Sequence, residues 1–129
     1  MTRGAAAYQQ TQVQGRTPLE LTVMLCDGAL RFLVEAKAAH QQGNMVARGR
    51  SLNKALAILA EFQSTLNMQE GGEIAVELDR LYAYMGMRLL EVSTKKDATA
   101  IDEVHRLLAT LRDGWAQIAA PALSMAAGA

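Results

Sequence analysis

The chain has 129 residues, a length that fits a single domain able to bury roughly two-thirds of the surface its unfolded form exposes. Its 13 basic and 13 acidic side chains cancel, so it lacks the positive field with which nucleic-acid-binding proteins neutralise phosphates. Alanine, leucine and methionine outnumber valine, isoleucine and the aromatic residues, which favours helices over strands. We therefore expect a small helical domain with no nucleic-acid partner.

Cys26 is the only cysteine in the chain, which leaves no pair of thiols for an internal disulfide, a metal site or a haem attachment. The first residues hold no apolar run of signal-peptide length, and no stretch reaches the roughly 18 consecutive apolar residues of a membrane-spanning helix. We therefore expect a protein that is kept in the reducing cytoplasm and does not insert into membranes.

The N-terminal segment, residues 1–16, is rich in glutamine, glycine, alanine and threonine. Tyr8 and Val13 are its sizeable apolar side chains, too few to offset the entropy that ordering would cost. This segment is expected to be a flexible arm.

The first helix is expected over residues 18–42. It starts at the sequence Thr17-Pro18-Leu19-Glu20, in which Thr17 can cap the helix, proline fits its first position and Glu20 can complete a capping box. Apolar residues then recur at spacings of three and four until Gly43-Asn44 interrupts the pattern. This expected core stripe comprises Leu21, Leu25, Ala29, Phe32, Ala36 and Ala39.

Three further helices are expected from the same spacing, over residues 45–68, 73–94 and 98–119. Gly71-Gly72 separates the second from the third, and Pro121 ends the fourth before a flexible tail at 121–129. Short polar links place consecutive helices side by side. The chain is therefore predicted to be all-α, with residues 17–120 forming an antiparallel up-down-up-down four-helix bundle. The expected core stripes are Leu52, Ala55, Leu59, Phe62 and Leu66; Ile74, Leu78, Leu81, Met85, Leu89 and Val92; and Ile101, Val104, Leu108, Leu111, Trp115 and Ile118.

Residue types that carry catalysis or bind metals are sparse and scattered. His40 and His105 are far apart in the sequence, and we assign both to the surface. One Asp102-x-x-His105 pair flanks the fourth stripe, whereas di-iron bundles need carboxylates on all four helices and two such motifs. Cys26 lies between apolar residues, as a small buried hydrophobic residue does. We expect no enzyme activity, no metal and no cofactor.

The first and third predicted helices carry a second apolar face. At about 100° per residue, apolar residues on each of these helices lie opposite the expected core stripe, and Tyr84 and Met87 can supply anchoring and adaptable contacts. The candidate partner-binding groove comprises Val23, Leu30, Val34, Val76, Ala83, Tyr84, Met87 and Leu90.

Two interpretations of these apolar faces are open. The two helices can be central and contact neighbours on both sides, or a homodimer can cover the faces. Alternatively, the faces accept amphipathic helices of a partner protein. In that case Tyr8 and Val13 of the arm could cover the groove until a partner arrives.

Several short segments, in this order and spacing, resemble the flagellar secretion chaperone FliS family over roughly residues 8–118. The main departure is Cys26, where the family pattern often carries tyrosine. The matching segments are Tyr8-Gln9-Gln10, Thr17-Pro18, Leu21-Thr22-Val23-Met24-Leu25-Cys26-Asp27-Gly28-Ala29-Leu30, Lys54-Ala55, Leu66-Asn67, Leu81-Tyr82-Ala83-Tyr84-Met85, Arg112-Asp113 and Trp115.

The resemblance implies a cytoplasmic chaperone that binds the C-terminal segment of new flagellin, prevents its premature polymerisation and assists its delivery to the flagellar type III export apparatus. It further implies that Tyr8 of the arm competes with flagellin for part of one apolar surface. The flagellar anti-sigma factor and the filament-cap protein are further expected partners. A helical adaptor or regulator of another flagellar protein, such as the anti-sigma factor, is the alternative function.

Overall fold

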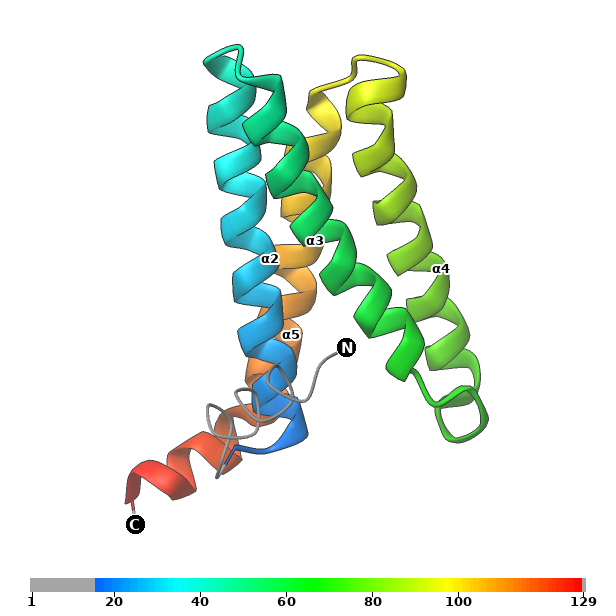
Figure 1. Ribbon diagram of the computed structural model, residues 1–129. Helices are drawn as coiled ribbons and strands as arrows, with labels where there is room; N and C mark the ends of the chain where they lie inside the picture. Colours follow the sequence, from blue (N-terminus) through cyan, green and yellow to red (C-terminus); the bar gives the residue numbers. More distant parts are fainter. Residues whose placement is uncertain (1–15, 129) are drawn as a thin grey trace, which may run out of the picture.

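The computed structural model describes the backbone of residues 16–128 and the side chains of residues 16–120. Four α-helices follow one another: α2 (Pro18–Gln41), α3 (Met45–Thr65), α4 (Met68–Thr94) and α5 (Thr99–Gly128) (Figure 1). No strand occurs within the described residues. The predicted all-α class is confirmed.

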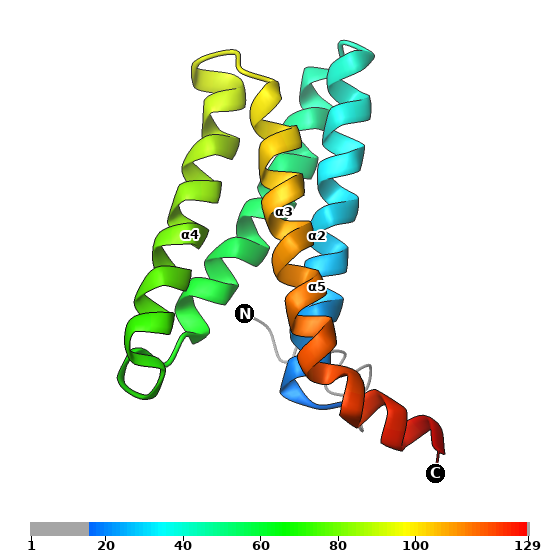
Figure 2. The ribbon, with the colours of Figure 1, turned by 180° about the vertical axis from the view of Figure 1, so that it is seen from behind.

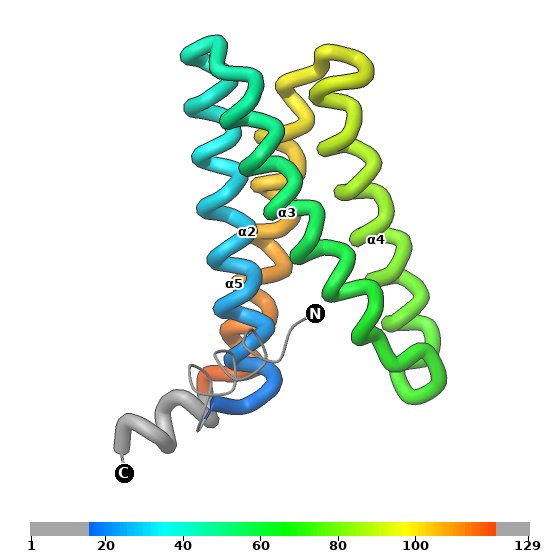
Figure 3. Tube along the Cα trace, in the orientation of Figure 1, coloured from blue at the N-terminus to red at the C-terminus, as the bar shows by residue number. Residues whose placement is uncertain are grey.

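The helices form an antiparallel bundle in which each contacts two others. α2 packs against α3, α3 against α4, α4 against α5, and α5 returns beside α2, which confirms the up-down-up-down topology. Figures 1 and 2 show that α2 and α5 run side by side along their length, whereas α3 and α4 diverge from that pair toward the turn that joins them. The bundle is therefore closed at one end and open at the other, as the tube in Figure 3 also shows.

Side-chain caps fix where three helices begin. At α2, the Glu20 backbone N–H donates to Thr17 Oγ1 at 3.1 Å, and the Thr17 N–H donates to Glu20 Oε1 at 3.3 Å, which is the predicted capping box. Asn44 and Asn67 cap α3 and α4 in the same way, since the side chain of each accepts a backbone N–H three residues later.

The predicted end of the second helix at 68 is wrong, whereas the predicted start of the third at 73 coincides with a break in the backbone of α4. α3 ends at Thr65 and α4 begins at Met68, because the Asn67 cap starts a helical turn before the glycine pair. Gly72 then breaks the helical backbone with φ 53° and ψ −129°, a conformation that a residue without Cβ adopts at low cost. The regular part of α4 therefore begins after Gly72, where the third helix was expected to start, and a single helical turn precedes it.

The predicted end of the fourth helix at 119 is also wrong, because α5 continues to Gly128. Pro121 lacks a backbone N–H, but this removes one intrahelical hydrogen bond and a helix can continue past it at a cost of about 3 kcal/mol. Most of the arm lies outside the described residues, so the flexibility expected of residues 1–16 stays a prediction. The flexibility expected of residues 121–129 also stays a prediction. None of the helices in the described part is long and apolar enough to cross a membrane.

The core follows the predicted stripes of α3 and most of α5, but its position on α2 and at the start of α4 differs. Leu33 is fully buried although it was not in the expected stripe, whereas Leu25 is exposed. Tyr82 is buried, while Ile74 and Ile118, both expected in the core, are 72% and 62% exposed. The largest fully buried side chains are Leu33, Met85, Leu89, Val92, Ile101, Val104 and Leu108.

Tyr82 closes the core where the bundle begins to open. Its ring lies 5.4 Å from that of Phe62, measured between centroids, and burial raises its pKa to about 12. The α2 core face carries the small residues Ala29 and Ala36, which let neighbouring helices approach closely, whereas large rings keep helices further apart.

Candidate partner-binding surfaces

The buried Cys26 thiol is unsuited to nucleophilic chemistry. Its side chain is completely buried, as expected from its apolar neighbours, and desolvation together with the adjacent Asp27 carboxylate raises its pKa to about 11. The thiol is therefore protonated at neutral pH, while a cysteine nucleophile reacts as the thiolate. Within the described residues, no group of three histidine, cysteine or acidic side chains could hold a metal ion.

Both histidines are half-buried rather than fully at the surface. His40 Nδ1 lies 3.1 Å from Arg48 Nη1 across the turn between α2 and α3. Because arginine has no lone pair to accept with, the imidazole nitrogen must accept this bond. This contact fastens a turn and indicates a structural role for His40.

The candidate residues of α2 lie along α5. Val23, Leu30 and Val34 share one helical stripe with Asp27 and Lys37, because the spacing between successive members is three or four residues. Asp27 accepts from Arg112 of α5 at 2.7 Å, and Lys37 Nζ lies 2.9 Å from Asp102 Oδ1, also on α5. Val34 is exposed on this stripe, whereas Val23 and Leu30 are half-buried.

The candidate residues of α4 mostly lie on its outer face beside α3. Val76, Ala83, Met87 and Leu90 share a stripe with Asp79, whose carboxylate accepts from the Gln63 amide of α3 at 3.1 Å. All four are exposed, and Leu90 is exposed to 56%. The outer face of α4 is therefore an apolar surface open to solvent.

Tyr84 lies on the other side of α4 and contacts α5. Its hydroxyl donates to Glu103 at 2.7 Å, and this bond, followed by one from Arg88, lowers the pKa of the Glu103 carboxyl. Arg88 also donates to Glu91 at 2.7 Å and to Asp97 at 2.9 Å. This network ties α4 to α5 near the turn that joins them, so the Tyr84 hydroxyl already has a partner in the free protein.

The structure does not bring the two apolar faces together into one groove. Within the described residues the backbones of α2 and α4 are not adjacent, although their core side chains belong to one cluster, and the two stripes border different neighbours, α5 and α3. Contact with two neighbours is common to all four helices, so it does not explain the exposure of Val34, Met87 and Leu90. A partner that uses both stripes must reach around the bundle.

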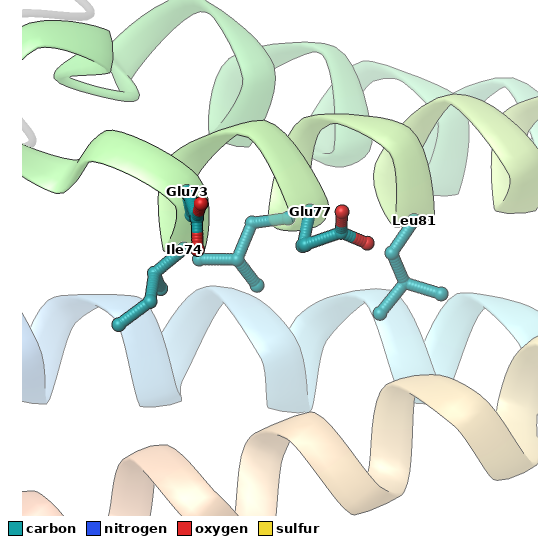
Figure 4. Close-up of a pocket in the computed structure, with 5 residues that line it drawn as sticks. Glu73, Ile74, Glu77 and Leu81 are labelled. Carbon is teal, nitrogen blue, oxygen red and sulfur yellow. The ribbon is translucent and has the colours of Figure 1, made fainter.

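A third apolar surface, which the sequence pattern placed in the core, lies at the open end. A hollow of about 540 Å³ is lined by Ile74, Leu78 and Leu81 together with Glu73 and Glu77. Figure 4 shows Ile74 and Leu81 directed from α4 toward the ribbons of α2 and α5. Helical spacing alone could not reveal this surface, because the exposure of these residues depends on how far the helices diverge.

Comparisons with known proteins agree with these features. The chain matches the family model described as flagellar protein FliS over residues 1–122. The flagellar secretion chaperone FliS of Salmonella typhimurium is 41% identical over 120 residues, which cover 89% of this chain and 89% of the relative. The FliS chaperone of Vibrio cholerae is 36% identical over 108 residues, covering 84% and 79% of the two chains. That of Bacillus subtilis is 36% identical over 111 residues, covering 86% and 82%.

Proposed function

Because this chain belongs to the FliS family of flagellar secretion chaperones, we propose that it binds the C-terminal segment of flagellin in the cytoplasm. Binding keeps flagellin from polymerising prematurely and assists its delivery to the flagellar type III export apparatus. The observation that carries this proposal is the exposure of large apolar side chains on three faces of a bundle whose core is already filled.

The distribution of these side chains favours a client that is unfolded when free. Val34 is exposed beside α5, Met87 and Leu90 beside α3, and Ile74 at the open end. A rigid partner would meet one of these faces, whereas a segment that folds on binding can wrap several. Covering such apolar area also explains how a chaperone prevents its client from using the same apolar residues for self-assembly.

The proposed contact residues keep the sequence-based set and add the open end. Exposed members contribute most, because half-buried side chains gain less from further burial. The proposed set comprises Val23, Leu30, Val34, Val76, Ala83, Tyr84, Met87 and Leu90, with Ile74 and Leu81 added.

The arm is proposed to compete with the client. Tyr8 and Val13 lie outside the described residues, but α2 begins at Pro18, and the start of α2 lies at the open end of the bundle (Figure 1). A segment of this length, fully extended at about 3.3 Å per residue, could reach along most of the bundle. Arm side chains that cover an apolar face must leave it before the client binds.

A calorimetric titration tests the proposal. The full chain and a version lacking residues 1–16 are titrated with the C-terminal segment of flagellin from the same organism. We expect binding with a negative heat-capacity change, and tighter binding without the arm. Absence of binding to both versions would overturn the proposed function, and equal affinities would overturn the role of the arm. Competition by the anti-sigma factor or filament-cap protein would identify shared use of the surface.

A further inference from the structure

The face where α2 packs against α3 carries two cations on one aromatic ring. The Arg31 guanidinium lies 5.8 Å from the centroid of the Phe32 ring, and Lys54 Nζ of α3 lies 5.3 Å from the same centroid. Phe32 is half-buried and packs against the core, so its ring is a fixed platform. The ring attracts both cations but does not cancel their charge.

Neither of these cations has an acidic partner within the described residues. Glu35, one turn after Arg31, and Glu61, two turns after Lys54, form no ion pair with them. Both cations lie within 6 Å of one ring centroid, and an anion that approaches this cluster would be attracted by both. Elsewhere in the described part of the chain, the cations that form ion pairs are Lys37, Arg80, Arg88, Lys95 and Arg112.

Apolar surface continues from this cluster toward the start of α2. Met24 and Leu25 are each exposed to 39% and precede Arg31 and Phe32 by seven residues, which is two helical turns on the same face. Between them, Gly28 carries no side chain, and a Cβ at this position would lie 3.8 Å from the Ile58 side chain. The Arg31 guanidinium lies 3.9 Å from the same Cβ position, so the basic cluster directly adjoins the exposed apolar side chains of Met24 and Leu25.

We propose that Arg31 and Lys54 receive a carboxylate of the client's amphipathic helix, whose apolar residues cover Met24 and Leu25. The adjoining apolar surface fits a peptide helix better than a nucleic acid, and the chain has no net charge to attract phosphates in general. The inference rests on the proposed function, because its occupant is the flagellin segment.

Titration with the flagellin segment at low and high salt tests this inference. The Arg31→Gln/Lys54→Gln variant is compared with Lys96→Gln/Arg106→Gln, which also removes two cations that form no ion pair within the described residues. We expect the first variant to bind about tenfold more weakly at low salt, with most of the difference lost at high salt. The control variant should bind like the unmodified chain. Circular dichroism verifies that both remain folded.

The carboxylate is identified by replacing each acidic residue of the segment with its amide. One replacement should reproduce the loss and have no further effect in the Arg31→Gln/Lys54→Gln background, because each change removes the same contact. Equal affinities of the two double variants would refute the inference. If those affinities are equal while Leu90→Asp abolishes binding, the proposed function stands without this contact. If the unmodified chain does not bind the segment, both the proposed function and this inference are refuted.

Discussion

Two adjacent leucines on α4 provide the sharpest test of which face of this helix is free. Leu89 is 1% exposed and belongs to the core, whereas its neighbour Leu90 is 56% exposed. Truncating a fully buried leucine to alanine removes its transfer free energy and leaves a cavity, at a cost of about 2–5 kcal/mol. The same change at an exposed position usually alters stability by about 0.5 kcal/mol or less.

Leu89→Ala and Leu90→Ala are therefore compared by thermal and urea unfolding. In a domain of this size, 1 kcal/mol corresponds to roughly 4 °C in Tm, so Leu89→Ala should lower Tm by about 8 °C or more and Leu90→Ala by less than about 2 °C. Comparable losses in the two variants would refute the assignment of Leu90 to a free surface. A loss at Leu90 that depends on protein concentration would show that a second copy covers this face.

Two further predictions concern the kink of α4 and its attachment to α5. Gly72→Ala should destabilise the fold by about 1–3 kcal/mol, because its φ of 53° disfavours any side chain. Gly49→Ala inside α3, where a Cβ meets nothing within 4 Å, should stabilise the fold by about 0.5–1 kcal/mol. Thermal unfolding of both variants checks this, and a change of Tm in the same direction for both would contradict it. Hydrogen bonds from Tyr84 and then Arg88 lower the pKa of Glu103 in the folded state, so its stabilising effect is present at neutral pH and is lost as pH falls below the ordinary value of 4.5. Arg88→Gln should therefore make the acid-side decline of Tm shallower, and an unchanged pH profile would count against the network.

Features decided by local chemistry were predictable from the sequence. The capping box at Thr17 and Glu20 depends on residues three positions apart, and the stripe of α3 has one apolar face, so its orientation was unambiguous. The topology followed because the links between helices are short. The break at Gly71-Gly72 was predictable for the same reason, but the helical turn that the Asn67 side chain caps before it was not.

Features that depend on packing between helices were not predictable in the same way. α2 is apolar on more than one face, so spacing alone could not decide that Leu33 is buried and Leu25 exposed. Tyr84 meets Glu103 from another helix, and no sequence pattern links the two. Ile74 continues a core stripe but lies where α3 and α4 diverge from the other pair, so its exposure follows from the shape of the bundle.

The exposed apolar face of α4 is proposed to bind the flagellin segment. It is tested most directly by titrating that segment into the Leu90→Asp variant and into Thr110→Asp, which adds the same charge to an exposed residue of α5. We expect both variants to fold normally. Leu90→Asp should lose most of its affinity, because binding would bury an unpaired carboxylate, while Thr110→Asp should retain it. Equal affinity in the two variants would contradict the claim.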